Sequence, residues 1–122
     1  MSTTWFATGA IAAGLGVVLG AFAAHGLESR VEPRLLANFE TGVRYQMYHA
    51  LALLAVAWAS QRFSHPAVNI AGWAFVVGIV VFSGSLYVMA LTGARWLGAI
   101  TPVGGLAFIL GWTALAIAAL KG

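Results

Sequence analysis

The chain has 122 residues, of which 61% are hydrophobic and 7% charged, and its formal net charge is +3. Together with a mean hydropathy of +0.93, this composition excludes an ordinary soluble domain, in which roughly a quarter of the residues are charged. The basic residues are scattered, which excludes a nucleic-acid-binding surface, and the absence of cysteine excludes disulfides, thiolate metal sites and cysteine nucleophiles.

The first predicted element is a helix over residues 5–25. Its uncharged run is long enough to cross a hydrocarbon core of about 30 Å. No Lys or Arg precedes that run, which is longer than a signal-peptide core, so we expect a retained helix. Small residues recur at four-residue intervals, at Ala12, Gly16, Gly20 and Ala24. This spacing predicts close packing against a neighbouring helix.

The connection over residues 27–38 is the most charged part of the chain. It holds two acids and two arginines, Glu28, Arg30, Glu32 and Arg34. The pattern is typical of a solvated face. If this stretch is helical, it predicts a short interfacial helix starting at Pro33, because proline fits the first turn of a helix.

The second predicted helix, residues 39–60, contains a polar half. Its wholly apolar part, residues 50–59, covers only about 15 Å, so crossing the bilayer requires residues 39–49 as well. That segment includes Glu40, Arg44 and His49. Ionisable groups at such depth usually face the interior of the bundle, so we expect these side chains to point inward.

Helical spacing predicts contacts for these groups. Glu40 and Arg44 are four residues apart in the favourable acid-first order, which predicts an ion pair. Arg44 should also reach Tyr87 or the carbonyls near Thr92 and Thr101. For His49 we expect a neutral imidazole, because burial and the positive charge of Arg44, within about two turns on the same helix, both disfavour its protonated form.

The expected hydrogen-bond partner of that imidazole is either Tyr45, on the same helix, or a hydroxyl of the third helix, that of Ser83 or Ser85.

The third and fourth predicted helices cover residues 67–92 and 101–120, and neither contains a charge in its apolar run. Thr101 and Pro102 are typical of a helix start. The chain is therefore predicted to be all-α, a single domain over residues 1–122 that forms an integral membrane bundle of four transmembrane helices. Four spans place both termini on one side of the membrane. The loops hold one more basic residue at one end than at the other, which predicts that both termini are extracytoplasmic.

An up-down bundle gathers most polar side chains at one membrane side. The candidate cluster consists of His25, Glu40, Arg44, Tyr45, Gln46, Tyr48, His49, Ser83, Ser85, Tyr87, Thr92 and Thr101. One interpretation is a structural cluster that locks the helices together. The other is a ligand or proton site made from Arg44, Tyr48 and His49.

Metal and cofactor chemistry are not expected. His25 lies at a helix end and His49 lies about 15 Å into its helix, and this difference in depth argues against a shared haem or metal site. No HExxH, phosphate loop or Ser-His-Asp arrangement is present, and the chain has only three acidic residues. The sequence therefore predicts no cofactor and no enzymatic activity.

Five segments resemble one known family in order along the chain. They are GAFAAHGL at 20–27, FETGVRYQMYHALA at 39–52, FSGSLY at 82–87, LTG at 91–93 and ITPVGG at 100–105. The family is called domain of unknown function 423 and is also named after human transmembrane protein 256. One departure is Ala23, where its motif usually has glycine. The resemblance implies a four-helix integral membrane protein, most simply bacterial, and it implies no particular activity.

The function expected from the sequence is that of a non-catalytic membrane component in the bacterial inner membrane. Its partners would be the lipid bilayer and either copies of itself or other membrane proteins. The alternative is a protein that binds or transports a small molecule, ion or proton through the cluster around Arg44 and His49. A fully hydrogen-bonded cluster favours the first reading, and a polar cavity open to one face favours the second.

Overall fold

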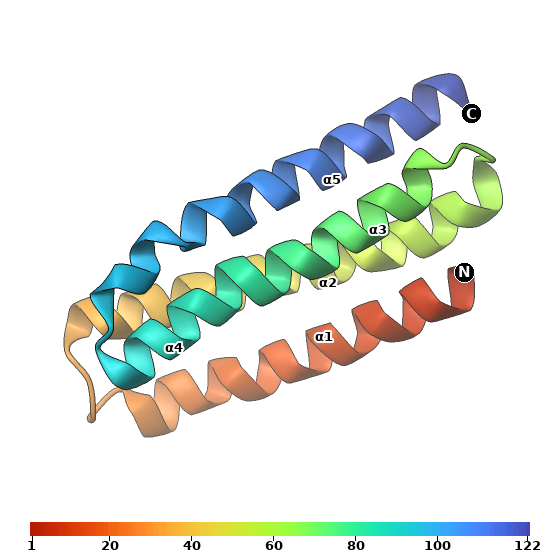
Figure 1. Ribbon diagram of the computed structural model, residues 1–122. Coiled ribbons are helices and arrows are strands. Elements are labelled where there is room, and N and C mark those ends of the chain that lie inside the picture. Colours follow the sequence, from red (N-terminus) through yellow and green to blue (C-terminus); the bar gives the residue numbers. More distant parts are fainter.

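The computed structural model describes all residues from 1 to 122, and every regular element in it is helical (Figure 1). The elements in chain order are α1 (Ser2–Phe22) with a π-helical turn (Ala23–Leu27), α2 (Pro33–Arg62), α3 (Ala67–Gly78) with a π-helical turn (Ile79–Ser83), α4 (Gly84–Thr92), a 3₁₀ turn (Arg95–Ala99) and α5 (Thr101–Lys121). Because α3, its π turn and α4 are continuous, the chain forms four helical rods.

Three of the four rods are long and apolar enough to cross a membrane, namely Ser2–Leu27, Ala67–Thr92 and Arg95–Lys121. The remaining rod, α2, has 30 residues and is about 45 Å long. Its length suffices for a span, but its first half carries the charged and polar residues. The all-helical prediction is therefore confirmed, and three spans follow from length and composition.

The second helix begins at Pro33, six residues before the start at residue 39 that the sequence suggested. Pro33 occupies the first turn, where its missing N–H costs nothing, and the preceding Glu32 has an extended backbone with ψ of 148°. The stretch that suggested a separate interfacial helix is thus the beginning of α2.

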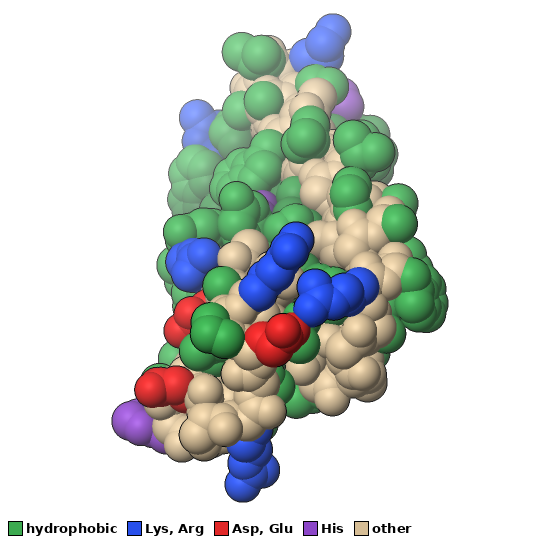
Figure 2. All heavy atoms as spheres, turned by 90° about the vertical axis from the view of Figure 1, so that its left-hand side faces the viewer, with side chains coloured by type: hydrophobic (Ala, Val, Ile, Leu, Met, Phe, Trp, Pro, Cys, Tyr) green, Lys and Arg blue, Asp and Glu red, His purple; other side chains and the backbone are tan.

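The rods pack in the order α1, α2, α3–α4 and α5. α1 lies along α2, α5 lies along α3, and α2 joins the two pairs through its contacts with α3 and α4. Both chain ends lie at one end of the bundle (Figure 1). Figure 2 looks onto the opposite end, where acidic and basic side chains lie close together.

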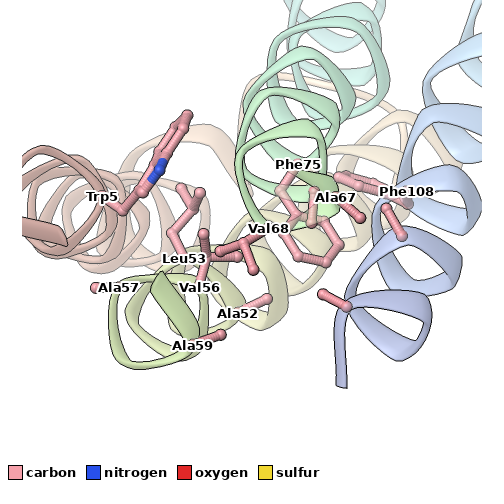
Figure 3. Packing of buried hydrophobic residues seen from close by; sticks show 13 residues of the cluster. Trp5, Ala52, Leu53, Val56, Ala57, Ala59, Ala67, Val68, Phe75 and Phe108 are labelled. Carbon is pink, nitrogen blue, oxygen red and sulfur yellow. The ribbon is translucent and has the colours of Figure 1, made fainter. Parts of the chain in front are cut away.

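The main hydrophobic core lies between α2 and α3 (Figure 3). Leu53 and Phe75 are fully buried there, with Trp5 of α1 on one side and Phe108 of α5 on the other. Gly72 makes room for the indole, because a Cβ atom at this position would lie 2.5 Å from the Trp5 ring. The core therefore depends on aromatic side chains from the outer helices packing over small residues of the central ones.

The small residues of α1 face α2. A Cβ atom on Gly16 would lie 3.4 Å from the Met47 side chain, and one on Gly20 would lie 3.4 Å from Val43. The close α1–α2 packing allows hydrogen bonds to form between the two helices.

Candidate functional site

The centre of the bundle contains a side chain that links three helices. Gln46 lies near the middle of α2 and is 4% exposed. Its Nε2 donates to the main-chain oxygen of Ala12 in α1 at 2.8 Å, and its Oε1 accepts from the hydroxyl of Tyr87 in α4 at 2.6 Å. Both halves of the amide are therefore engaged, one to each neighbouring helix.

A second hydrogen bond joins α2 to the π turn that precedes α4. The Ser83 hydroxyl, which is fully buried, donates to the main-chain oxygen of Gly42 at 2.7 Å. A Cβ atom on Gly42 would lie 2.8 Å from the ring of Tyr87. Glycine at this position therefore lets both Ser83 and Tyr87 approach the backbone of α2.

His49 forms a third link, to α5. Its Nδ1 lies 2.8 Å from the main-chain oxygen of Tyr45, and Trp112 Nε1 donates to its Nε2 at 3.1 Å. A carbonyl only accepts and an indole N–H only donates, so the proton must be on Nδ1 and absent from Nε2. The imidazole ring also stacks on Phe108, with centroids 3.6 Å apart. The geometry thus selects a neutral imidazole, as expected, and of the expected alternatives the partner is Tyr45 and not Ser83 or Ser85.

A separate pair of hydroxyls joins α4 to the start of α5. The oxygens of Ser85 and Thr101 lie 2.6 Å apart, so one hydroxyl donates to the other. The accepting hydroxyl then donates to a main-chain oxygen, that of Phe82 for Ser85 or of Leu97 for Thr101. The polar residues predicted as one cluster therefore form several small hydrogen-bonded groups at different levels of the bundle.

All of these groups are satisfied within the protein. Every buried side-chain nitrogen or oxygen has a hydrogen-bond partner. Polar groups in a hydrocarbon environment require such internal partners, and the bonds of Gln46, of Ser83 and of His49 with Trp112 run between helices. The arrangement is chemically suited to holding the helices in register.

Five of the predicted residues, His25, Glu40, Arg44, Tyr48 and Thr92, lie outside these groups, and all five are exposed. The expected Glu40–Arg44 ion pair is wrong, as is the expectation that Arg44 points into the bundle. The Arg44 guanidinium donates to the Thr41 hydroxyl at 3.1 Å, and the chain's single ion pair joins Arg95 to Glu32 at 2.7 Å.

Helical geometry explains why Arg44 faces outward. Each residue turns about 100° around the axis, so the inward face of α2 at this level passes through Gly42, Gln46 and His49, at intervals of four and three residues. Arg44 lies two residues from both Gly42 and Gln46, which places it on the opposite face. Tyr45 lies between the two faces, and its ring packs on Phe82 at 4.7 Å. Thr92 is also exposed and bonds to its own helix.

Sequence reasoning missed three partners. Trp112 lies within an uncharged apolar run that gives no sign of a polar role, and the Ala12 acceptor is a main-chain atom that no side-chain pattern reveals. Trp5 donates to Asn69 Oδ1 at 3.0 Å, across the end of the bundle away from the charged loops. The indole N–H of a Trp usually finds a partner when it is buried, which is the signal that could have found Trp5, 1% exposed; Trp112 is 47% exposed, and this signal does not point to it.

Residues 19–105 match the family described as "Protein of unknown function (DUF423)". The UPF0382 membrane protein YwdK of Bacillus subtilis is 51% identical over 93% of this chain and 93% of its own length. The UPF0382 membrane protein of Haemophilus influenzae is 43% identical over 86% of this chain and 84% of its own. No solved structure matches. The chain belongs to the DUF423 family and is a multi-pass membrane protein.

Proposed function

We propose that this DUF423 protein crosses the membrane with all four helices and serves as a non-catalytic component that packs against a second copy of itself through the outer face of α2. The observation that carries the proposal is the exposed Arg44, which lies at membrane depth and has only Thr41 as a hydrogen-bond partner in its own chain.

The packing of α1 along α2 supports a fourth span. Ser2 and Gln61 are hydrogen-bonded at 3.3 Å, and Gly20 faces Val43, so the two helices run antiparallel side by side. α1 belongs to an apolar candidate span, Ser2–Leu27. Residues 43–61 of α2 then share the depth of residues 2–20 of α1. The polar groups on the inward face of α2 are already hydrogen-bonded within the protein, so only the outer face of α2 is exposed to lipid or to another protein.

The same alignment gives the depth of Arg44. Its neighbour Val43 faces Gly20, which is seven residues from the end of the apolar span at Leu27. At 1.5 Å per residue, Arg44 lies about 10 Å inside the end of that span. A charged group at this depth is costly when it lacks partners, and a neighbouring protein can supply them.

A second copy of the chain offers a complementary surface. Glu40 is exposed on the same outer face, one turn from Arg44, and Tyr48 is 54% exposed on the next turn. In a symmetric dimer the same face is used by both copies. If the two α2 helices are parallel, Glu40 of each copy lies within about one turn of Arg44 of the other.

The interior of the bundle supports a non-catalytic role. The polar side-chain atoms of Gln46 and His49 are already hydrogen-bonded, chiefly to neighbouring helices. The acids, Glu28, Glu32 and Glu40, are all exposed, so none lies in the interior of the bundle. Arg44 and His49 lie on different faces of α2, so a transport site built from both has no support in the geometry.

Cysteine crosslinking in native membranes tests the proposed interface, because the natural chain contains no cysteine. We expect Tyr48→Cys to form a disulfide-linked dimer under mild oxidation. Val17→Cys and Ile109→Cys, at exposed positions of α1 and α5, are matched controls that should stay monomeric. Adding Arg44→Gln to Tyr48→Cys should remove the dimer. Dimers of equal yield at all three positions, or Tyr48→Cys crosslinks only to proteins of other mass, contradict the self-association.

A further inference from the structure

A groove lies at the charged end of the bundle, between the first turns of α2, the end of α4 and the start of α5. Its volume is about 400 Å³. Its lining includes the buried apolar side chains of Leu35, Leu86 and Met89, which form its floor, and the exposed arginines Arg34 and Arg95, which lie at its edge. The groove therefore combines a hydrophobic surface with two cationic side chains from segments far apart in the sequence.

We propose that this groove binds an anionic phospholipid, with the phosphate of the headgroup between Arg34 and Arg95 and an acyl chain over the apolar floor. The proposal rests on the membrane placement of the bundle proposed above, and it is independent of the proposed dimer. Pockets between membrane helices that carry basic residues at headgroup level are suited to anionic lipids.

The charges at the groove favour an anion. Arg95 donates from Nη2 to Glu32, and its remaining N–H groups are available to a phosphate. Arg34 has no ion pair. Two arginines and Glu32 leave one net positive charge at the mouth. α5 begins beside the groove at Thr101 and has no acidic residue in its first turn, so the positive end of its helix dipole adds to the attraction.

The position of the groove matches the headgroup layer. Trp96 follows Arg95 in the chain and is 68% exposed, and tryptophan is enriched at membrane–water interfaces. The charged loops gather at this end (Figure 2). In the expected orientation this end faces the cytoplasm, where anionic lipids give the leaflet a negative surface potential.

The full-length protein offers three informative substitutions. Arg34→Gln removes the unpaired cation, so we expect about fivefold weaker binding of phosphatidylglycerol. Glu32→Gln should strengthen that binding by a similar factor, because the substitution frees Arg95 from its ion pair. The Glu32 side chain makes no hydrogen bond that caps α2, so the substitution removes no cap. Arg30→Gln is the matched control, since Arg30 is exposed on the same connection and does not line the groove.

The measurement is native mass spectrometry of the detergent-solubilised protein with phosphatidylglycerol or phosphatidylcholine of identical acyl chains. We expect the protein to bind phosphatidylglycerol in preference to phosphatidylcholine. Excess inorganic phosphate should not abolish this binding, because the acyl chain also packs on the apolar floor of the groove. Equal binding of the two lipids overturns the proposal, as does an equal loss in Arg30→Gln and Arg34→Gln. Complete displacement by inorganic phosphate would show a simple anion site instead. Circular dichroism confirms that each variant is folded, and none of these readouts depends on dimer crosslinking.

Discussion

Replacing Gln46 with leucine should weaken the bundle at its centre. The substitution keeps a side chain of similar size but removes both interhelical bonds, to the Ala12 carbonyl and to the Tyr87 hydroxyl. Interhelical hydrogen bonds in membrane proteins contribute about 0.6 kcal/mol on average and up to about 1.7 kcal/mol. A stranded polar group adds about 1–3 kcal/mol, and half-buried Tyr87 belongs at the low end. We therefore expect Gln46→Leu to lower the free energy of unfolding by about 1–3 kcal/mol.

A double-mutant cycle isolates the bond between the two side chains. Tyr87→Phe alone should lower the free energy of unfolding by about 0.5–1.5 kcal/mol. In the double variant no stranded hydroxyl remains, so the combined loss should fall short of the sum by about 1 kcal/mol. Unfolding in mixed micelles with increasing sodium dodecyl sulfate, followed by far-ultraviolet circular dichroism, measures all three values.

Thr113→Val provides a control for this series. Thr113 is exposed on α5, and its substitution should change the free energy of unfolding by less than about 0.5 kcal/mol. If the loss in the double variant equals the sum of the two single losses within about 0.3 kcal/mol, the hydrogen bond is refuted as a link between α2 and α4.

Three further predictions use the same unfolding assay. Gly9→Ala should destabilise the α1–α2 contact by about 1–3 kcal/mol, because its Cβ would lie 2.7 Å from a main-chain oxygen of α2. Gly14→Ala, with nothing within 4 Å, should instead be neutral or stabilise by up to about 1 kcal/mol, and equal effects of the two substitutions would contradict the packing. Trp112→Phe should lower the free energy of unfolding by about 1 kcal/mol, because His49 Nε2 loses its donor, and no loss would argue against that bond. Arg95→Gln should change the free energy of unfolding by less than about 1 kcal/mol, since its ion pair is exposed, and a larger loss would mean that the pair is a structural lock.

The helical class could be predicted from the sequence because the apolar runs are long and nearly free of charge. That the polar residues occupy the first half of α2 also followed from the sequence. Their direction did not, because the rule that ionisable groups at membrane depth point inward does not hold for Arg44. The position of Gly42 carried the missing information: it marks the close approach of α4, and it thereby identifies Gln46 and His49 as the inward face and Arg44 as the outer one.

Hydrogen bonds to main-chain atoms were beyond sequence reasoning. The acceptor for Gln46 is a carbonyl of α1, and the acceptor for Ser83 is a carbonyl of α2. Such atoms occur at every position, so only the packing of the helices decides which one is reached. The start of α2 at Pro33 was partly predictable, because the proline does mark a helix start, although of α2 itself and not of a separate short helix.

The most direct test of the account is the sidedness of the two chain ends, because a fourth span through α2 requires both on one side. Ser2→Cys, Gly122→Cys and, in the charged connection, Ser29→Cys can each be labelled with a membrane-impermeant maleimide in spheroplasts and in inverted vesicles. The account predicts that Ser2→Cys and Gly122→Cys react only in intact spheroplasts and that Ser29→Cys reacts only in inverted vesicles. Labelling of the two ends from opposite sides would contradict it, because α2 would then not cross the membrane.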